Sequence, residues 1–552
     1  MPTIRVSAIQ FAVTEDVNAN LATALRMIDT AAQHKPHIIV TPEFINHILW
    51  FEDLDHCWRV SLDRDSEFLK AIGFKAKEHN CYIKVNVTLR REYPKITGTN
   101  ILFDPGGAPI AFTDKQILMG NENNFLTPAD EPAQVVRTPI GALGMYCCMD
   151  GVIPEPARAL AVRGAQILLN SLNSFAHDEA SLHIPVRSGE NKVFVVAANK
   201  IGALVPPHMA QAVADRLKIP ADAIAGAGES QIIAPDGTVL AKAPKRGEAA
   251  IYADIEVDAA LNKRRPDGTD LLASRRPPLY TPIAASPSPR RISAGADTAI
   301  AAVYQPASND INEIIAVIQQ NKDIQLIVLP ELLPSPLGSR AGDEGNVITK
   351  IQTALQDSGT HLVTSIQQND SHLGLLLNKD GILLRQPQLH LCGRHPWATE
   401  LGDQLEVIDL PFGRLAIVVG GDAIYPEIFR LAALQDVDVV AVTTQVLEDW
   451  EMTHGFLERA AENRMNLVVA TQPSKSGTSA LFALDKDFTL WTQWEKPFNG
   501  NINHPMVVRA PNAPGLTRAE IYPAQAANKV ISQKTHLIEN RPWRLAKGII
   551  TA

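Results

Sequence analysis

Residues 148–171 read CMDGVIPEPARALAVRGAQILLNS and return in altered form at residues 420–443 as GGDAIYPEIFRLAALQDVDVVAVT. Asp150 and Asp422 lie 272 positions apart, and the same offset continues downstream. The pairs that keep it are Asp150 and Asp422, Pro154 and Pro426, Glu155 and Glu427, Arg187 and Arg459, Glu190 and Glu462, and Asn191 and Asn463. An offset this long indicates the duplication of a whole domain, not a solenoid of short repeats.

Shorter echoes extend the duplication to both halves of the chain. TPEF at residue 41 corresponds to LPEL at residue 329, and ASRRPPLY at residue 273 corresponds to IENRPWRL at residue 538. Between the copies, residues 274–291 contain five prolines and no apolar periodicity, which is typical of a linker or a surface tail. We therefore expect a first domain at 1–282, a linker at 283–295 and a second domain at 296–552.

The pattern of apolar residues at the N-terminus predicts the class of fold. Residues 4–11 and 38–41 are short apolar runs that predict buried strands, and residues 18–34 between them have helical periodicity. Strands that alternate with helices of this length indicate an α/β architecture.

Composition excludes several classes of protein. The 552 residues are 45% hydrophobic and 20% charged, as in ordinary globular chains, and the net charge is −9. No basic field is available for nucleic acid, and no apolar run is long enough to span a membrane. Five cysteines are too few for a disulfide framework, which favours a reducing compartment. We expect a cytoplasmic protein without nucleic-acid or membrane partners.

Cys148 is the first candidate for chemistry. It follows a predicted strand and precedes a Pro-Glu pair that can open a helix, so its side chain is expected at the carboxyl edge of a sheet, where α/β sites form. A buried and inert thiol is the common alternative for any single cysteine. Neighbouring residues at a strand end point in opposite directions, so at most one of Cys147 and Cys148 can face the site.

A reactive thiol needs a base and a donor for the negative charge that develops on the substrate. Glu43, at the end of an apolar strand, is the first candidate base. Its alternative role is that of an acidic residue that stabilises the N-terminus of a helix. His177 and His183 are weaker candidates because plain surface positions explain them equally well. Lys115 also follows a strand-like segment, and Glu122 lies seven positions further on. Taken alone, both would be ordinary loop residues.

In combination these segments resemble a known family. TPEF, DKQIL followed by E-x-x-F-L-T-P, C-M-D-x-x-x-P-E and RSGENKVFVVAAN follow the order and spacing of the nitrilase, or carbon–nitrogen hydrolase, superfamily over residues 4–282. The resemblance implies an α-β-β-α sandwich in each copy and a triad of Cys148, Glu43 and Lys115, supported by Glu122. It also implies that the backbone N–H of Met149 helps to bind the oxyanion, and that no metal or cofactor is needed.

The residues after the nucleophile narrow the expected reaction. True nitrilases carry Trp-Glu there, whereas Met149-Asp150 is closer to the amidase and carbamoylase branches. We expect hydrolysis of an amide or N-carbamoyl bond in a small molecule through a thioester. An acyltransferase that uses the same thioester and a nitrile-hydrolysing enzyme are the alternatives, and a non-enzymatic scaffold is disfavoured because all four residues are present.

Two features are candidates for the substrate pocket. Phe44, Trp50 and Asn173 are the individual candidates, although aromatic residues such as Trp50 are equally often ordinary core. Residues 203–226 have no counterpart in the second copy, which makes this insertion a candidate lid.

The second copy keeps Glu331 at the position of Glu43 but loses the rest of the triad. Gly420 replaces the nucleophile, Pro387 or Gln388 replaces Lys115, and Arg394 or His395 falls at the position of Glu122. We therefore expect a catalytically inactive domain. Members of the superfamily pair two sandwiches face to face, so we expect the copies to form an intrachain pseudodimer in which the second supports the first. Further homo-oligomerisation is left open.

Overall fold

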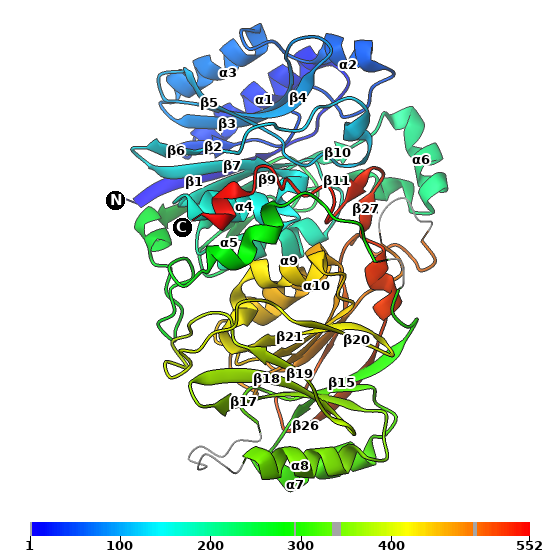
Figure 1. Ribbon diagram of the computed structural model, residues 1–552. Helices are drawn as coiled ribbons and strands as arrows, with labels where there is room; N and C mark the ends of the chain where they lie inside the picture. Colours follow the sequence, from blue (N-terminus) through cyan, green and yellow to red (C-terminus); the bar gives the residue numbers. More distant parts are fainter. Residues whose placement is uncertain (1–2, 292–293, 334–343, 489–493, 552) are drawn as a thin grey trace. The chain divides into compact units, whose positions relative to one another are not determined.

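The computed structural model describes residues 3–291, 294–333, 344–488 and 494–551. The chain forms two compact units (Figure 1). Unit 1 consists of residues 1–262, 487–503 and 530–549, and unit 2 of residues 263–486, 504–529 and 550–552. Each unit therefore contains segments from both halves of the sequence.

The first sheet of unit 1 has six strands in the order β14-β1-β2-β3-β4-β5. The strands β1, β2 and β3 are parallel, and the remaining neighbours are antiparallel. Their bounds are Thr3–Gln10 for β1, Ile38–Val40 for β2, Tyr82–Arg90 for β3, Ile96–Phe103 for β4, Pro109–Asp114 for β5 and Ala249–Glu256 for β14.

The second sheet of unit 1 has the order β13-β12-β9-β8-β7-β6, and its central strands β7, β8 and β9 are parallel. Apolar side chains from both sheets form one buried cluster between them, which includes Val6, Val40, Met145 and Val196. The bounds are Val135–Thr138 for β6, Gly141–Cys147 for β7, Ile167–Leu172 for β8, Phe194–Asn199 for β9, Gln231–Ile233 for β12 and Val239–Lys242 for β13.

Helices cover the outer faces of both sheets of unit 1. In α1 (Val17–Ala32), Asp16 caps the first turn by accepting N–H bonds from Asn18 and Ala19. Its buried residues Ala24, Met27, Ile28 and Ala31 follow helical spacing and pack with α3 (Glu67–Glu78) against the first sheet (Figure 1). The second sheet is covered by α4 (Pro154–Val162) and α5 (Ile184–Gly189). The short helix α2 spans Leu54–Val60.

Two additions complete unit 1. The first is the insertion. Its strands β10 (Ile201–Ala203) and β11 (Ala225–Ala227) pair with each other, and helix α6 (Ala210–Leu217) lies between them in the sequence. The distal segments carry the hairpin β27 (Val530–Ser532) and β28 (Thr535–His536) and the helix α11 (Lys547–Ile550). Figure 1 shows α11, in red, beside α4, where Gly548 lies against the Arg163 side chain.

Unit 2 repeats the two sheets in the same order. One sheet is β19-β18-β17-β16-β15-β26, and the other is β20-β21-β22-β23-β24-β25. The first sheet comprises β15 (Ala299–Gln305), β16 (Leu326–Val328), β17 (His361–Gln368), β18 (Ser371–Asn378), β19 (Gly381–Pro387) and β26 (Gly515–Ile521). The second comprises β20 (Val407–Leu410), β21 (Gly413–Val419), β22 (Val439–Thr443), β23 (Asn466–Ala470), β24 (Ala480–Ala483) and β25 (Met506–Arg509).

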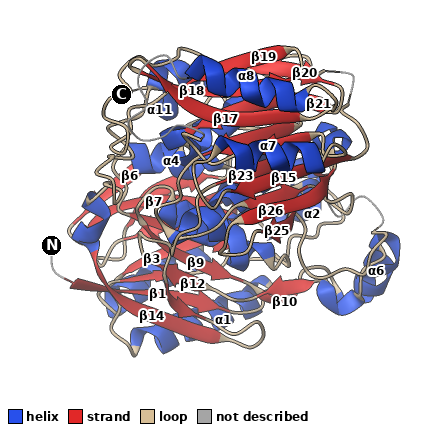
Figure 2. Cartoon of the chain, turned by 90° about the horizontal axis from the view of Figure 1, so that it is seen from below, coloured by secondary structure: helices blue, strands red, loops and turns tan. Residues whose placement is uncertain are grey.

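The helices of unit 2 also correspond to those of unit 1. Helices α7 (Ile311–Gln320) and α8 (Glu344–Leu355) lie along β15 and β17, as Figure 2 shows, and share a buried cluster with that sheet. Helices α9 (Pro426–Leu434) and α10 (Phe456–Asn463) follow β21 and β22. The predicted α/β class and the duplication of an α-β-β-α sandwich are therefore confirmed.

The compact units divide the chain differently from the sequence repeat. Residues 263–282, which we assigned to the first domain, pack with unit 2, and two segments beyond residue 486 pack with unit 1. Part of the proline-rich stretch is not a solvated tail. Tyr280 and Ile283 are buried, and the Tyr280 hydroxyl lies 2.6 Å from His390 Nε2. Among the described residues, no helix is both long and apolar enough to cross a lipid bilayer.

Candidate active site

Cys148 occupies a strained turn between β7 and α4. Its backbone φ is +46°, in the left-handed region that side chains with a β-carbon rarely adopt, and such strain concentrates at functional sites. Hydrogen bonds to the side chains of Asn170 and Asp150 hold the turn. The Cys148 N–H donates to Asn170 Oδ1 at 3.1 Å, and Asp150 accepts the N–H groups of Gln116 and Ile117 at 3.1 and 2.9 Å. The turn is thereby tied to the loop that begins with Lys115.

Lys115 joins two glutamates inside unit 1. Its Nζ donates to Glu43 Oε1 and to Glu122 Oε1, at 2.8 Å in both cases. Lys115 and Glu43 are completely buried, and Glu122 is 3% exposed. The structure therefore brings together the residues that the sequence analysis grouped from three separate segments.

Burial and mutual charge control the protonation of this cluster. Burial works against the charged form of Lys115, but the charges of Glu122 and Glu43 outweigh it and hold the pKa of Lys115 well above its usual value. Burial raises the pKa of Glu122 to about 7 against the opposing effect of Lys115. Burial, followed by the charge of Glu43, also raises the pKa of the Cys148 thiol well above its usual value. The resting thiol is therefore protonated at neutral pH.

The two adjacent cysteines have different surroundings. Cys148 is 9% exposed and lines two cavities, whereas Cys147 is completely buried. Cys147 Sγ lies 3.6 Å from Asn100 Nδ2 and 3.9 Å from Asp150 Oδ2. Burial raises the pKa of the Cys147 thiol well above its usual value as well.

A cavity of about 360 Å³ opens at Cys148. Glu122, Trp50 and Asn173 line it, and the insertion supplies an apolar wall that includes Leu204 and Leu217. A smaller cavity of about 70 Å³ also contains Cys148 and Asn173. Of the three predicted pocket residues, Trp50 and Asn173 line this space. Phe44 instead is completely buried, and its ring centroid lies 5.4 Å from Lys115 Nζ.

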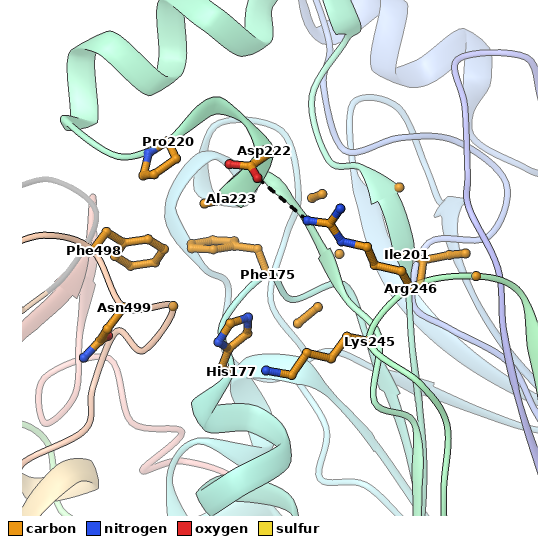
Figure 3. Close-up of a pocket in the computed structure, with 16 residues that line it drawn as sticks. Phe175, His177, Ile201, Pro220, Asp222, Ala223, Lys245, Arg246, Phe498 and Asn499 are labelled. Carbon is orange, nitrogen blue, oxygen red and sulfur yellow. Dashed lines mark ion pairs between the residues drawn. The ribbon is translucent and has the colours of Figure 1, made fainter.

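The two weaker candidate bases lie around these cavities. His183 lines the smaller cavity, with its Nε2 3.8 Å from Asp178 Oδ2. His177 lines a neighbouring cavity of about 700 Å³. Figure 3 shows this larger cavity, in which Phe175 faces Phe498 and Arg246 is paired with Asp222 at 3.7 Å. Phe175 lines all three cavities, which therefore lie next to one another in unit 1.

The distal hairpin of unit 1 supplies pocket residues that sequence reasoning missed. Ser532 and Gln533 line the cavity at Cys148. The Thr535 hydroxyl fixes the hairpin by accepting the Gly120 N–H at 3.1 Å and donating to the Leu118 carbonyl at 2.9 Å.

A second distal segment, residues 494–503, lines the smaller cavity with Ile502 and Asn503. Asp178 Oδ2 accepts the N–H groups of Ile502 and Asn503 at 3.1 and 2.6 Å. Trp494 packs in the same apolar cluster as Leu217 of the insertion. These residues lie more than 300 positions from Cys148, and no local sequence signal points to them.

Gly420, the position in unit 2 that corresponds to Cys148, has a similar turn but no room for a side chain. Gly420 has a φ of +54°, close to that of Cys148. A β-carbon on Gly420 would lie 2.7 Å from Gln388 Oε1 and 3.0 Å from the His372 ring. Glu331 is paired with Arg394 at 3.0 Å and lies 3.6 Å from His395 Nε2.

Comparison with known proteins agrees with this architecture. The family model described as carbon-nitrogen hydrolase matches residues 5–264 and 296–493. An N-carbamoylputrescine amidase of Solanum lycopersicum is 26% identical over 50% of this chain and 93% of its own length. A nitrilase of Pyrococcus abyssi is 26% identical over 47% of this chain and 92% of its own.

Among solved structures, an amidase from Nesterenkonia sp. AN1 matches with 21% identity and a TM-score of 0.40. The match covers 50% of this chain and 94% of that one. The two family matches together cover most of the chain, which therefore belongs to the carbon–nitrogen hydrolase family, also called the nitrilase superfamily. It is a hydrolase that acts on carbon–nitrogen bonds.

Proposed function

We propose that unit 1 hydrolyses an amide or N-carbamoyl bond of a small molecule through a thioester on Cys148. The observation that carries this proposal is the buried Lys115 ammonium, which joins Glu43 and Glu122 in the cluster that includes Cys148. Cys148 and Glu122 line the cavity of about 360 Å³, and Lys115 and Glu43 lie buried behind them, which supports a base, a cation and a thiol acting at this cavity. The proposed nucleophile, base and cation are therefore Cys148, Glu43 and Lys115.

Thiol activation is assigned to Glu43. Its Oε1 is occupied by Lys115, whereas its buried Oε2 has no hydrogen-bond partner among the described residues. Glu43 Oε2 accepts the Cys148 proton as the sulfur attacks the substrate carbon, which forms the carbon–sulfur bond. The carbonyl electron pair moves to oxygen and gives a tetrahedral oxyanion.

The oxyanion is bound by Lys115 Nζ and the backbone N–H of Met149. Glu43 then returns the proton to the departing amine, the carbon–nitrogen bond breaks and a thioester remains. Glu43 next takes a proton from water, which attacks the thioester and releases the acid and the thiol. Glu122 holds Lys115 in place throughout these steps. No step requires a metal or a cofactor.

The cavity favours a small substrate with a neutral amide or carbamoyl end and an apolar body. A volume of about 360 Å³ limits the size of the substrate, and the walls from Leu49, Leu204 and Leu217 are apolar. Asn173 and Gln533 supply polar groups that can orient the amide. Several relatives are N-carbamoylputrescine amidases, which keeps N-carbamoyl amines among the candidate substrates.

Transfer of the acyl group to an amine or to hydroxylamine is the second candidate reaction, because it uses the same thioester. Product analysis with and without an added amine separates the two reactions. Acid that forms at the same rate in both conditions supports hydrolysis. An acylated amine that replaces the acid supports transfer.

The role proposed for the second copy is structural. It lacks a nucleophile at Gly420, and the chain beyond residue 486 supplies Ser532, Gln533, Ile502 and Asn503 to the cavities of unit 1. The intrachain pseudodimer and any further homo-oligomer stay predictions, which small-angle scattering of the whole chain would test. A cytoplasmic location is likewise part of the proposal.

A panel of small amides, N-carbamoyl compounds and nitriles, with ammonia release as the readout, tests the proposed reaction. We expect ammonia from amides or N-carbamoyl compounds, and none from the Cys148→Ala variant. Ammonia from nitriles alone would replace amide hydrolysis by nitrile hydrolysis. Equal ammonia release by the wild type and the Cys148→Ala variant would exclude the proposed nucleophile.

A further inference from the structure

A second buried lysine lies near the Cys148 site. Lys200 is 2% exposed, and its Nζ has no hydrogen-bond partner among the described residues. The same aromatic ring lies close to both ammonium groups, because the centroid of Phe44 is 5.4 Å from Lys115 Nζ and 6.0 Å from Lys200 Nζ. An ammonium that is buried without a partner is costly, so its position requires an explanation.

The fold holds the Lys200 backbone firmly at the end of β9. The Lys200 carbonyl accepts the Gly228 N–H at 3.0 Å, and the Lys200 N–H donates to Asn199 Oδ1 at 2.9 Å. Gly226 of β11 passes so close that a β-carbon there would lie 2.4 Å from the Lys200 carbonyl oxygen. Lys200 therefore lies where β9 meets the base of the insertion, and its side chain has little freedom to leave the interior.

A count of charges shows what Lys200 can do. One ammonium, Lys115, is shared by the two carboxylates Glu43 and Glu122, so these three groups carry one excess negative charge when ionised. Another buried lysine, Lys84, also interacts with Glu43, but its Nζ donates to the Ser171 hydroxyl. A buried net charge is unfavourable unless a counter-charge lies nearby. Lys200 interacts electrostatically with Glu43, Cys148 and Glu122. Burial lowers the pKa of Lys200 to about 7, against the effect of these negative charges.

We propose, on the basis of the proposed function, that Lys200 is a positioning residue whose ammonium balances the Lys115–Glu43–Glu122 cluster and thereby supports formation of the Cys148 thiolate. It acts through the charge of the cluster and not by contact with the substrate. Loss of this ammonium leaves the excess negative charge uncompensated. Ionisation of the Cys148 thiol, with its proton lost from the site, then adds a second uncompensated negative charge, so the thiolate is harder to form.

The test measures the reactivity of Cys148 and the stability of the full-length protein. Iodoacetamide is attacked by the thiolate, which forms a carbon–sulfur bond and releases iodide, so the alkylation rate reports thiolate formation. In Lys200→Met we expect Cys148 alkylation to slow on the order of tenfold. We also expect kcat to fall by a similar factor with little change in KM. The thermal midpoint is measured on the same samples, so that a slower alkylation is interpreted only in folded protein.

Two further variants at this position and one control complete the experiment. Lys200→Gln, a second neutral variant, should behave like Lys200→Met, and Lys200→Arg, which keeps the charge, should restore most of the alkylation rate. Lys242→Met is the control, because Lys242 lies on strand β13 of the same sheet, is bound to Glu229 at 2.7 Å and is 41% exposed. It should alkylate like the wild type.

The outcomes separate this inference from the proposed function. If Cys148 alkylates at the wild-type rate in folded Lys200→Met and Lys200→Gln, the role of Lys200 is overturned while the nucleophile stands. If the wild type alkylates elsewhere and spares Cys148, the proposed function itself fails.

Discussion

The turns at Cys148 and Gly420 have nearly the same backbone and different surroundings. Asp150 accepts the N–H groups of Gln116 and Ile117, and Asp422 accepts those of Leu389 and His390 at 2.8 and 2.9 Å. Both turns have a positive φ. Around Cys148 there is a cavity, whereas Gln388 and His372 lie against Gly420.

The difference teaches that the turn is a structural element which can exist without the chemistry. The second copy keeps the carboxylate that fixes the loop, Asp422, and the acid at the strand end, Glu331. Arg394 now pairs with that acid, whereas in unit 1 a lysine joins two glutamates. The carboxylate-to-backbone contacts build the turn, and the thiol, the lysine and the open space are the features needed for the proposed reaction.

The largest effect is expected from removal of the thiol. Cys148→Ala should abolish turnover, because no thioester can form, while Cys147→Ala should retain most of it, because Cys147 is completely buried beside Asn100. The measurement is kcat on an amide that the wild type hydrolyses, with circular dichroism to confirm folding. An active Cys148→Ala together with a folded but inactive Cys147→Ala would show that the wrong cysteine was assigned.

The second-largest loss of activity is expected from Lys115→Met. The loss of one oxyanion donor costs roughly 10²–10³ in rate, and this variant also leaves Glu43 and Glu122 without their shared cation. The matched change in the other copy is Gln388→Met. It should lower thermal stability, because a buried hydrogen bond to His372 is lost, but leave kcat unchanged. Near-normal kcat in Lys115→Met, or a strong loss in Gln388→Met, would break the comparison between the copies.

The site and the fold differ in how far the sequence predicts them. Glu43, Lys115 and Cys148 are recognisable because each lies in a local motif at a strand end, and Glu122 because it lies in the motif of the loop after Lys115. Thr535 and Gln533 are not, since their places depend on chain folding across more than 380 positions. Lys200 was missed because a single lysine after a strand has no pattern. The proline-rich composition around Tyr280 predicts a solvent-exposed segment. It cannot reveal that the Tyr280 side chain is buried and that its hydroxyl contacts His390.

A smaller effect is expected from the insertion. Replacing residues 204–224 with a short glycine linker removes the apolar wall formed by Leu204 and Leu217. We expect KM and the range of accepted amides to change more than the thermal midpoint, because this part of unit 1 lies outside the two sheets. Steady-state kinetics on a series of amides of increasing length is the measurement. Unchanged kinetics would remove the insertion from the substrate site.

The distal hairpin should show a weaker effect of the same kind. Thr535→Val removes the hydroxyl that accepts the Gly120 N–H and donates to the Leu118 carbonyl, which costs about 1 kcal/mol of stability. KM should rise with little change in kcat, because Ser532 and Gln533 are less firmly held at the cavity. Thr281→Val is the control at an exposed threonine. Equal KM values for the two variants would show that the hairpin does not shape the pocket.

The least effect on activity is expected from Gly420→Ala. A side chain at φ +54° is strained and would contact Gln388, so stability should fall by about 1–3 kcal/mol. Activity of the folded protein should stay at the wild-type level. Chemical denaturation and kcat are measured on the same preparation. A loss of kcat in folded protein would give the second copy a role in the reaction that the account denies.

The central claim is that the reaction forms a thioester on Cys148. No residue of the second copy is expected to carry an acyl group. The direct measurement is an acid quench during turnover of an amide, followed by peptide mapping by mass spectrometry. The account predicts an acyl group on the peptide that contains Cys148, at Cys148 itself, and none on the peptides that contain Gly420 or Cys392. An acyl group on Cys147 or Cys392, with Cys148 free during turnover, would contradict it.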